Sequence, residues 1–148
     1  MFPGVRTFAE DLKRGLEREG VVRPKIATFM NRKMVKTTDP FHPMDFVDEE
    51  DTNQYGEHKD RSTFSYATLR DKCGGTVWVG KNKVDYIAKT PNARCDFFFS
   101  LKDGLYKATF DDEFPKFPTR FHARDRPDKK NDGGYVVDIP LRKLVKVA

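Results

Sequence analysis

Two carboxylates and one amine lie close together in the segment at residues 41–61, FHPMDFVDEEDTNQYGEHKDR. Asp45 stands in a short apolar run, and Glu57 and Lys59 follow an acidic gap within YGEHK. Two carboxylates and a main-chain carbonyl form a hard oxygen site that suits Mg²⁺ or Mn²⁺. Such an ion binds a phosphate oxygen and makes a bound water more acidic, while a lysine ammonium can orient the attacking water or stabilise charge on the phosphate. The pattern therefore predicts a metal-dependent site for phosphodiester cleavage.

Two strands joined by a polar turn would position these groups. The predicted strands are residues 44–47 and 55–59, and the predicted turn is residues 48–54. Because side chains alternate across a strand, Glu57 and Lys59 share one face and His58 points the other way. Asp45 joins the cluster if the two strands are adjacent, and His58 is a further candidate metal ligand. The alternative is a solvated hairpin with Glu57 and Lys59 as surface residues.

The rest of the chain predicts one α/β domain with an N-terminal helix packed on a central mixed β-sheet. Helical spacing of apolar residues predicts a helix from Val5 to Glu19, ended by Gly20. The following segment up to Met34 fits either a second helical piece or an irregular cover over the sheet. We expect the cluster of site residues at one edge of the sheet.

Later elements follow from apolar alternation and turn residues. Further strands are predicted at residues 76–79, 83–89, 96–101, 105–110 and 135–139. A hairpin is predicted at Asp103-Gly104 because this dipeptide favours tight turns. Residues 64–72 fit a weak helix or an extended segment, residues 111–134 are predicted to be irregular, and residues 141–147 form a short final element.

Composition limits the class of protein. The 148 residues suit one domain, and 13 Phe supply a core. A net charge of +5 favours an anionic partner such as nucleic acid, although a merely basic surface is the alternative. Cys73 and Cys95 have no zinc-site spacing and are predicted to be ordinary reduced thiols. No apolar run reaches membrane length and no signal-peptide core is present, so we expect no membrane partner. We expect a soluble intracellular protein, a class that includes proteins made by a virus inside its host.

The segment HPMDFVDEEDTNQYGEHKDR resembles the active-site hairpin of the PD-(D/E)XK nuclease superfamily, which includes restriction enzymes, Holliday-junction resolvases and many phage and giant-virus nucleases. Its pattern is an acid that ends one strand, then acid-x-Lys on the next strand, often preceded by a helix with another acid. Two departures are that Met44 separates Pro43 from Asp45, and that His58 occupies a place that is more often apolar.

This resemblance implies a restriction-endonuclease-like fold and a Mg²⁺- or Mn²⁺-dependent endonuclease that hydrolyses DNA. Asp45, Glu57 and Lys59 would take the metal and catalytic roles. Glu10 on the first helix is a candidate fourth catalytic residue, with Glu17 and Glu19 as competitors. Many relatives act as dimers, so a homodimer is an expectation from the resemblance.

Basic residues outside the motif are candidate contacts to the nucleic-acid backbone. Arg61 and Ser62 directly follow the motif, and a solvated strand end is their alternative. A second set in a Pro-containing stretch comprises Arg120, Arg124 and Arg126, with Lys129 and Lys130 beside them. Its alternative is a charged loop balanced by neighbouring aspartates. We expect Phe97–Phe99 to be core and sheet residues and Trp78 to be buried. We expect His42 and His122 to be surface or turn residues.

Two rival functions remain beside the nuclease. The first is a non-catalytic nucleic-acid-binding or virion assembly component that keeps the fold for architecture. The second is a small basic subunit of a larger assembly, with the acids merely on its surface. Metal-dependent cleavage of DNA by the purified protein separates the nuclease from both rivals.

Overall fold

A mixed sheet of six strands forms the centre of the molecule in the computed structural model, which describes residues 7–30, 32–39, 42–123 and 134–148. The strand order is β1-β2-β3-β5-β6-β9, and a second sheet has the order β4-β8-β7. Within the larger sheet, β3 and β5 are parallel and the other neighbouring pairs are antiparallel. The described part of the chain is one α/β domain.

The elements have the following bounds. The strands of the larger sheet are β1 (Met34–Lys36), β2 (Phe46–Asp48), β3 (Gln54–Asp60), β5 (Arg94–Leu101), β6 (Gly104–Thr109) and β9 (Val145–Lys146). The smaller sheet contains β4 (Thr76–Gly80), β7 (Thr119–His122) and β8 (Gly134–Pro140). The α-helices are α1 (Phe8–Met30), α2 (Tyr66–Lys72) and α3 (Lys81–Lys89), and two 3₁₀ turns are η1 (Phe114–Lys116) and η2 (Leu141–Lys143).

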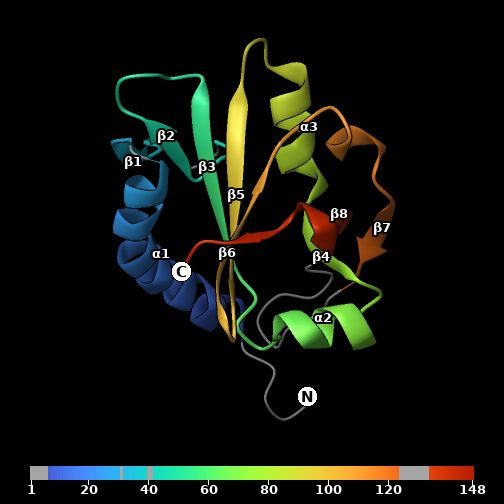
Figure 1. Cartoon of the computed structure of the whole chain (residues 1–148). Coiled ribbons are helices and arrows are strands. Elements are labelled where there is room, and N and C mark those ends of the chain that lie inside the picture. Colours follow the sequence, from blue (N-terminus) through green and yellow to red (C-terminus); the bar gives the residue numbers. More distant parts are fainter. Residues whose placement is uncertain (1–6, 31, 40–41, 124–133) are drawn as a thin grey trace.

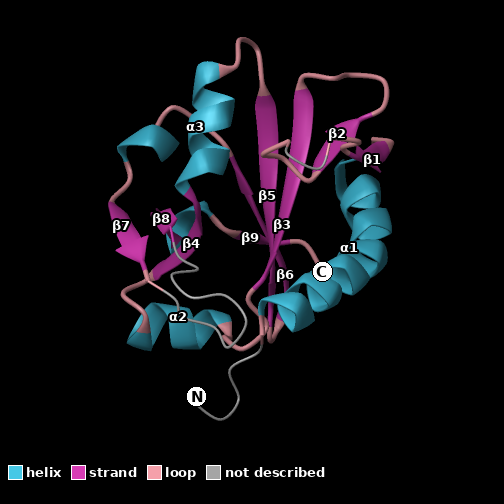
Figure 2. Cartoon of the chain, turned by 180° about the vertical axis from the view of Figure 1, so that it is seen from behind, coloured by secondary structure: helices cyan, strands magenta, loops and turns pink. Residues whose placement is uncertain are grey.

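Helix α1 covers one face of the six-stranded sheet, as Figures 1 and 2 show from opposite sides. Val22 and Ile26 on the helix pack with Phe46 and Phe98 on the strands, and these side chains are buried. A Cβ atom at Gly56 of β3 would lie 3.8 Å from Ile26 Cγ2 of α1 and 3.3 Å from Met34 Cε of β1, so this residue points toward the helix. The even-numbered residues of β3 therefore face α1.

Helix α3 and the smaller sheet cover the opposite face. Tyr55 of β3 and the fully buried Phe97 and Phe99 of β5 pack against a core that includes Val79 of β4 and Val84 of α3. The result is three layers, with the six-stranded sheet in the middle (Figure 1). The odd-numbered residues of β3, which include Glu57 and Lys59, face this second core.

The predicted hairpin around the acidic turn is confirmed. Strands β2 and β3 are antiparallel neighbours, with Phe46 opposite Gly56 and Val47 opposite Tyr55. The first strand begins two residues later than predicted, so Asp45 lies immediately before β2 and not inside it. The strands predicted at residues 76–79, 96–101, 105–110 and 135–139 also form, with shifts at their ends.

The prediction for the first helix was wrong about its end. Helix α1 continues through Gly20 and Pro24 to Met30. Proline removes one backbone N–H from a helix, but tertiary packing outweighs this local loss when an apolar face is buried. Val22 and Ile26 provide that buried face on either side of Pro24. The same helix resolves the ambiguous segment, since residues up to Met30 belong to it and Met34 starts β1.

The strand predicted at residues 83–89 was also wrong, because this segment is helix α3. Its buried residues Val84 and Ile87 are three apart, which places them on one face of a helix and on opposite faces of a strand. An ion pair of 2.7 Å between Lys81 and Asp85, four residues apart, supports the helical turn.

Three further predictions need correction. The cluster of site residues lies on an interior strand and not at a sheet edge, because β3 stands between β2 and β5. The segment predicted to be irregular contains η1 and β7. Trp78, predicted to be buried, is half-buried and packs against the core. Phe97–Phe99 are core residues as predicted. No helix in the described residues is long and apolar enough to cross a membrane.

Candidate functional site

The structure brings Asp45 and Glu57 together. Asp45 donates its backbone N–H to Glu57 Oε2 at 2.8 Å, and the Asp45 carboxylate is near the backbone N–H of His58 at 3.5 Å. This contact follows from the hairpin register, since Asp45 precedes Phe46 and Phe46 is opposite Gly56. The two carboxylates predicted to share a site are therefore neighbours on the α3 face of the sheet.

Glu57 is a buried acid with 1% of its surface exposed. Burial and, after it, the negative charge of Asp45 raise the pKa of Glu57 to about 8. The charges of Lys59 and Lys83 act in the opposite direction and lower this pKa. The solvated hairpin with a surface Glu57 is therefore excluded, because the side chain lies inside the protein.

Lys83 on α3 is a member of this cluster that the sequence interpretation missed. Its Nζ lies 2.8 Å from Glu57 Oε1, and only 15% of the Lys83 side chain is exposed. The ammonium donates a hydrogen bond to the Pro43 carbonyl, while Glu57 Oε1 is in ion-pair contact without a hydrogen bond of good geometry. Lys83 was missed because residues 83–89 were predicted to be a strand. A helical assignment with Val84 and Ile87 inward would have turned Lys83 toward the sheet.

Lys59 extends from the same face of β3 as Glu57, two residues further along the strand. Its side chain is half-buried, and its charge lowers the pKa of Glu57. Among the described residues, no hydrogen bond or ion pair occupies its ammonium. The amine predicted for the site is thus close enough to act on the buried carboxyl electrostatically, and it is available to a ligand.

A ring cluster anchors the loop that carries Asp45. His42 accepts a hydrogen bond from the Met44 backbone N–H, and its other ring nitrogen is 3.3 Å from the Tyr86 hydroxyl. That hydroxyl is also 3.2 Å from the Tyr55 hydroxyl. The three rings are 5.1 to 5.6 Å apart between centroids. Helix α3 therefore holds this loop at Tyr86 as well as at Lys83.

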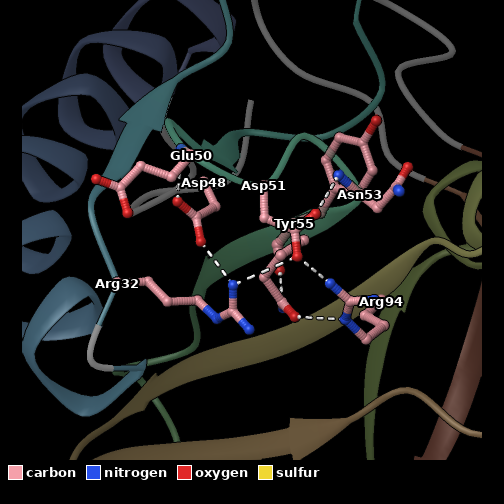
Figure 3. Close-up of polar contacts among 8 residues, drawn as sticks. Arg32, Asp48, Glu50, Asp51, Asn53, Tyr55 and Arg94 are labelled. Atoms are coloured by element: carbon pink, nitrogen blue, oxygen red, sulfur yellow. Dashed lines mark hydrogen bonds and ion pairs between the residues drawn. The ribbon is translucent and has the colours of Figure 1, made fainter.

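The acidic turn between β2 and β3 is fixed by arginines, as Figure 3 shows. Arg32 is 2.7 Å from the buried carboxylate of Asp48 and 3.5 Å from Asp51. Arg94 at the start of β5 pairs with Asp51 and donates to Gln54 at 3.2 Å. The hydrogen bonds from Arg32 and from the backbone hold the pKa of Asp48 below its ordinary value. These pairs connect the residue before β1 to β2, and the β2–β3 turn and β3 to β5, so they hold the strands that carry the site.

His58 lies on the opposite face of β3 from Glu57. Its Nε2 is 2.7 Å from the Ser100 hydroxyl of β5, and the ring is buried. Burial lowers the pKa of His58 to about 4. The structure therefore does not bring the His58 imidazole together with the carboxylates of Asp45 and Glu57, although His58 directly follows Glu57 in the chain.

Glu10 lies in the first turn of α1, far from the cluster along the helix. Its carboxylate accepts the Thr7 backbone N–H at 3.4 Å, and its own N–H is donated to the Thr7 hydroxyl at 3.0 Å. This reciprocal pair is a capping box at the helix start. The helix contacts β3 near Ile26, about 24 Å further along its axis. Glu17 is exposed, and the side chain of Glu19 lies outside the described residues.

Two of the candidate nucleic-acid contacts, Arg61 and Arg120, come from distant parts of the chain and meet at the ring of Trp78, at 4.8 and 5.6 Å from its centroid. Arg61 is half-buried just after β3, and Ser62 donates its N–H to Asp60 at 3.0 Å. Arg120 lies on β7 and pairs with Asp138 at 2.9 Å. Arg124 and Arg126 lie outside the described residues.

The donor set allows a limited test of the predicted metal. Among the described residues, no group of three or more His, Cys, Asp or Glu side chains could hold an ion. Magnesium is commonly bound through one or two carboxylates, with waters and substrate phosphates as the other ligands. Asp45 and Glu57 fit this pattern, and Glu57 Oε1 is a buried acceptor without a hydrogen bond. Comparisons with protein-family models, curated proteins and solved structures find no match to this chain.

Proposed function

We propose that the protein hydrolyses DNA phosphodiester bonds with a divalent metal ion, at a PD-(D/E)XK-type endonuclease site on a restriction-endonuclease-like fold. The observation that carries the proposal is the convergence of Asp45 and Glu57, joined by a 2.8 Å hydrogen bond, with Lys59 on the same face of β3. The acid-x-Lys pattern on one strand beside an acid at the neighbouring strand is the arrangement that the resemblance implies. The strand placement supports this proposal, although Asp45 stands before β2 and does not end a strand.

Each residue would have a distinct role. Asp45 and Glu57 would hold Mg²⁺ or Mn²⁺, which when bound would polarise a phosphate oxygen and make water more acidic. Lys59 would stabilise the negative charge that develops on the phosphate or orient the attacking water. Lys83 would act as a positioning residue, because it contacts both Glu57 and the Pro43 carbonyl of the Asp45 loop.

The decisive experiment compares chemistry with binding in Lys59→Ala. A lysine that stabilises developing charge contributes more to the transition state than to the ground state. Single-turnover cleavage should therefore fall by about 10²-fold or more, while DNA affinity stays close to that of the wild type. Both quantities are measured on one sample, by gel analysis of cleavage with Mn²⁺ and by fluorescence anisotropy with labelled DNA.

Lys107→Ala is the matched control. Lys107 is a half-buried lysine opposite Phe98, on the α1 face of the same sheet. It should cleave like the wild type. Unchanged cleavage in Lys59→Ala would make the YGEHK pattern a coincidence and would reject the proposed role.

A non-catalytic nucleic-acid-binding or assembly role is the second candidate, and one observation favours it. The ammonium of Lys83 already lies 2.8 Å from Glu57, so the buried pair could serve architecture alone. Calorimetry with Mn²⁺ separates the two functions. The nuclease proposal expects binding that Asp45→Ala abolishes, whereas the architectural role expects salt-dependent DNA binding with neither Mn²⁺ binding nor cleavage.

A further inference from the structure

Three cationic or titratable side chains converge on the indole ring of Trp78. The guanidinium carbon of Arg61 lies 4.8 Å from the ring centroid and that of Arg120 lies 5.6 Å from it. The ring of His122 is 6.0 Å away at an interplanar angle of 30°. These four residues, here called the Trp78 patch, come from three separate segments of the chain.

Arg61 is held in place and forms no ion pair with a carboxylate among the described residues. Burial lowers the pKa of Arg61 to about 10, and the charge of the neighbouring Asp60 opposes this shift. It donates to the Trp78 carbonyl at 3.2 Å and to the Asp60 carbonyl at 3.5 Å. Its Nε is buried and has no hydrogen-bond acceptor. A guanidinium of this kind has five N–H donors, and those not used by the protein suit a phosphate group.

The two arginines also act electrostatically on the third member of the patch, His122. Burial and, after it, the charges of Arg120 and Arg61 lower the pKa of His122, while Asp138 opposes this effect. Arg120 is paired with Asp138, yet its side chain is 43% exposed and its planar group can also bind an anion. Trp78 itself is half-buried.

The patch also adjoins the candidate site. Arg61 follows Lys59 by two residues, a distance of about 7 Å along an extended chain. We propose that the Trp78 patch binds the phosphodiester backbone of DNA next to the phosphate that Lys59 faces. This inference rests on the proposed function, since DNA is the partner in both. It adds that the Trp78 patch is the surface that holds the DNA strand.

Trp78 makes the inference directly testable because it is the one tryptophan of the chain. A short labelled DNA duplex is titrated without divalent ions, and two signals are followed, namely fluorescence anisotropy of the label and emission of Trp78. The two signals should change with the same midpoint. Arg120→Ala should weaken affinity roughly tenfold and reduce the slope of log affinity against log salt by about one.

Arg142→Ala is the matched control. Arg142 is also exposed, pairs with Glu113 at 2.8 Å and lies 5.9 Å from the ring of Phe117. It should bind like the wild type. Since Arg120 and Arg142 are both partly exposed, neither replacement should unfold the protein.

The outcomes separate this inference from the proposed function. If the protein cleaves DNA, but Trp78 emission does not change on binding and Arg120→Ala binds DNA like the wild type, the inference is overturned and the proposed function stands. Binding through Trp78 without metal-dependent cleavage would support the inference and reject catalysis. Absence of DNA binding by the wild type at low salt would overturn both.

Discussion

Replacement of Glu57 by glutamine should change how the stability of the protein depends on pH. Burial and the nearby charge of Asp45 raise the pKa of Glu57 from 4.5 to about 8. In the unfolded chain the same carboxyl titrates near its ordinary value, so within this interval the folded protein keeps a proton that the unfolded chain has lost. The free energy of unfolding of the wild type therefore falls as pH rises through the interval.

The magnitude follows from the displacement of the pKa. One pKa unit is worth about 1.4 kcal/mol, so the full displacement corresponds to roughly 5 kcal/mol. Glutamine has nearly the same shape and does not titrate. The quantity to compare is the unfolding free energy of Glu57→Gln minus that of the wild type. Between pH 4.5 and about 8 this difference should rise by about 1.4 kcal/mol per pH unit, and above this interval it should stay constant. Loss of the contact with Lys83 changes the difference in unfolding free energy by the same amount at every pH in this interval. His58 titrates in both proteins, so its contribution is absent from the difference.

Urea unfolding of the metal-free proteins at several pH values, followed by circular dichroism, measures this difference. Glu113→Gln is the matched control, because Glu113 is exposed and hydrogen bonds from Arg142 and Lys143 hold its pKa below 4.5. Its difference from the wild type should be flat over the same interval. Parallel pH profiles of Glu57→Gln and the wild type would refute the reasoning, since they would mean that the carboxyl ionises in the folded protein as easily as in water.

Two further replacements test residues around the site. Glu10→Ala should leave DNA cleavage at the wild-type rate and lower the unfolding free energy by about 1 kcal/mol or less, because the carboxylate caps α1; a large loss of cleavage in the folded variant would place Glu10 in the site instead. Arg32→Ala should lower the unfolding free energy by roughly 2 kcal/mol, because it leaves the buried Asp48 without its ion pair. In an Asp48→Asn background, Arg32→Ala should lower the unfolding free energy by less. An equal loss in both backgrounds would contradict a stabilising ion pair between Arg32 and Asp48.

Local sequence determined much of the framework that carries the site. Strands β2 and β3 were predictable because apolar runs flank an acidic turn, and the strand period placed Glu57 and Lys59 on one face. The hairpin between β5 and β6 was predictable from Asp103-Gly104. These features depend on residues that are near in sequence, so a local pattern is sufficient to find them.

Tertiary packing decided what the local pattern left open. Helix α1 passes through Gly20 and Pro24 because burial of Ile26 against the sheet outweighs two unfavourable local residues. Helix α3 forms where a strand was predicted, and it brings Lys83 to Glu57 across 26 residues of sequence. The short run KNKVDYIAK fits both the helical and the strand period. Only the packing of Val84 and Ile87 in the core distinguishes the two.

The pKa of Glu57 also depends on the tertiary structure. The sequence supplied the identities of Asp45 and Glu57, but the depth of burial that raises the pKa of Glu57 depends on the layers above and below β3. The meeting of Arg61 and Arg120 at Trp78 also joins segments from both sheets. Charge, desolvation and contact between distant segments are properties of the packed molecule, because each depends on neighbours that the linear order does not place side by side.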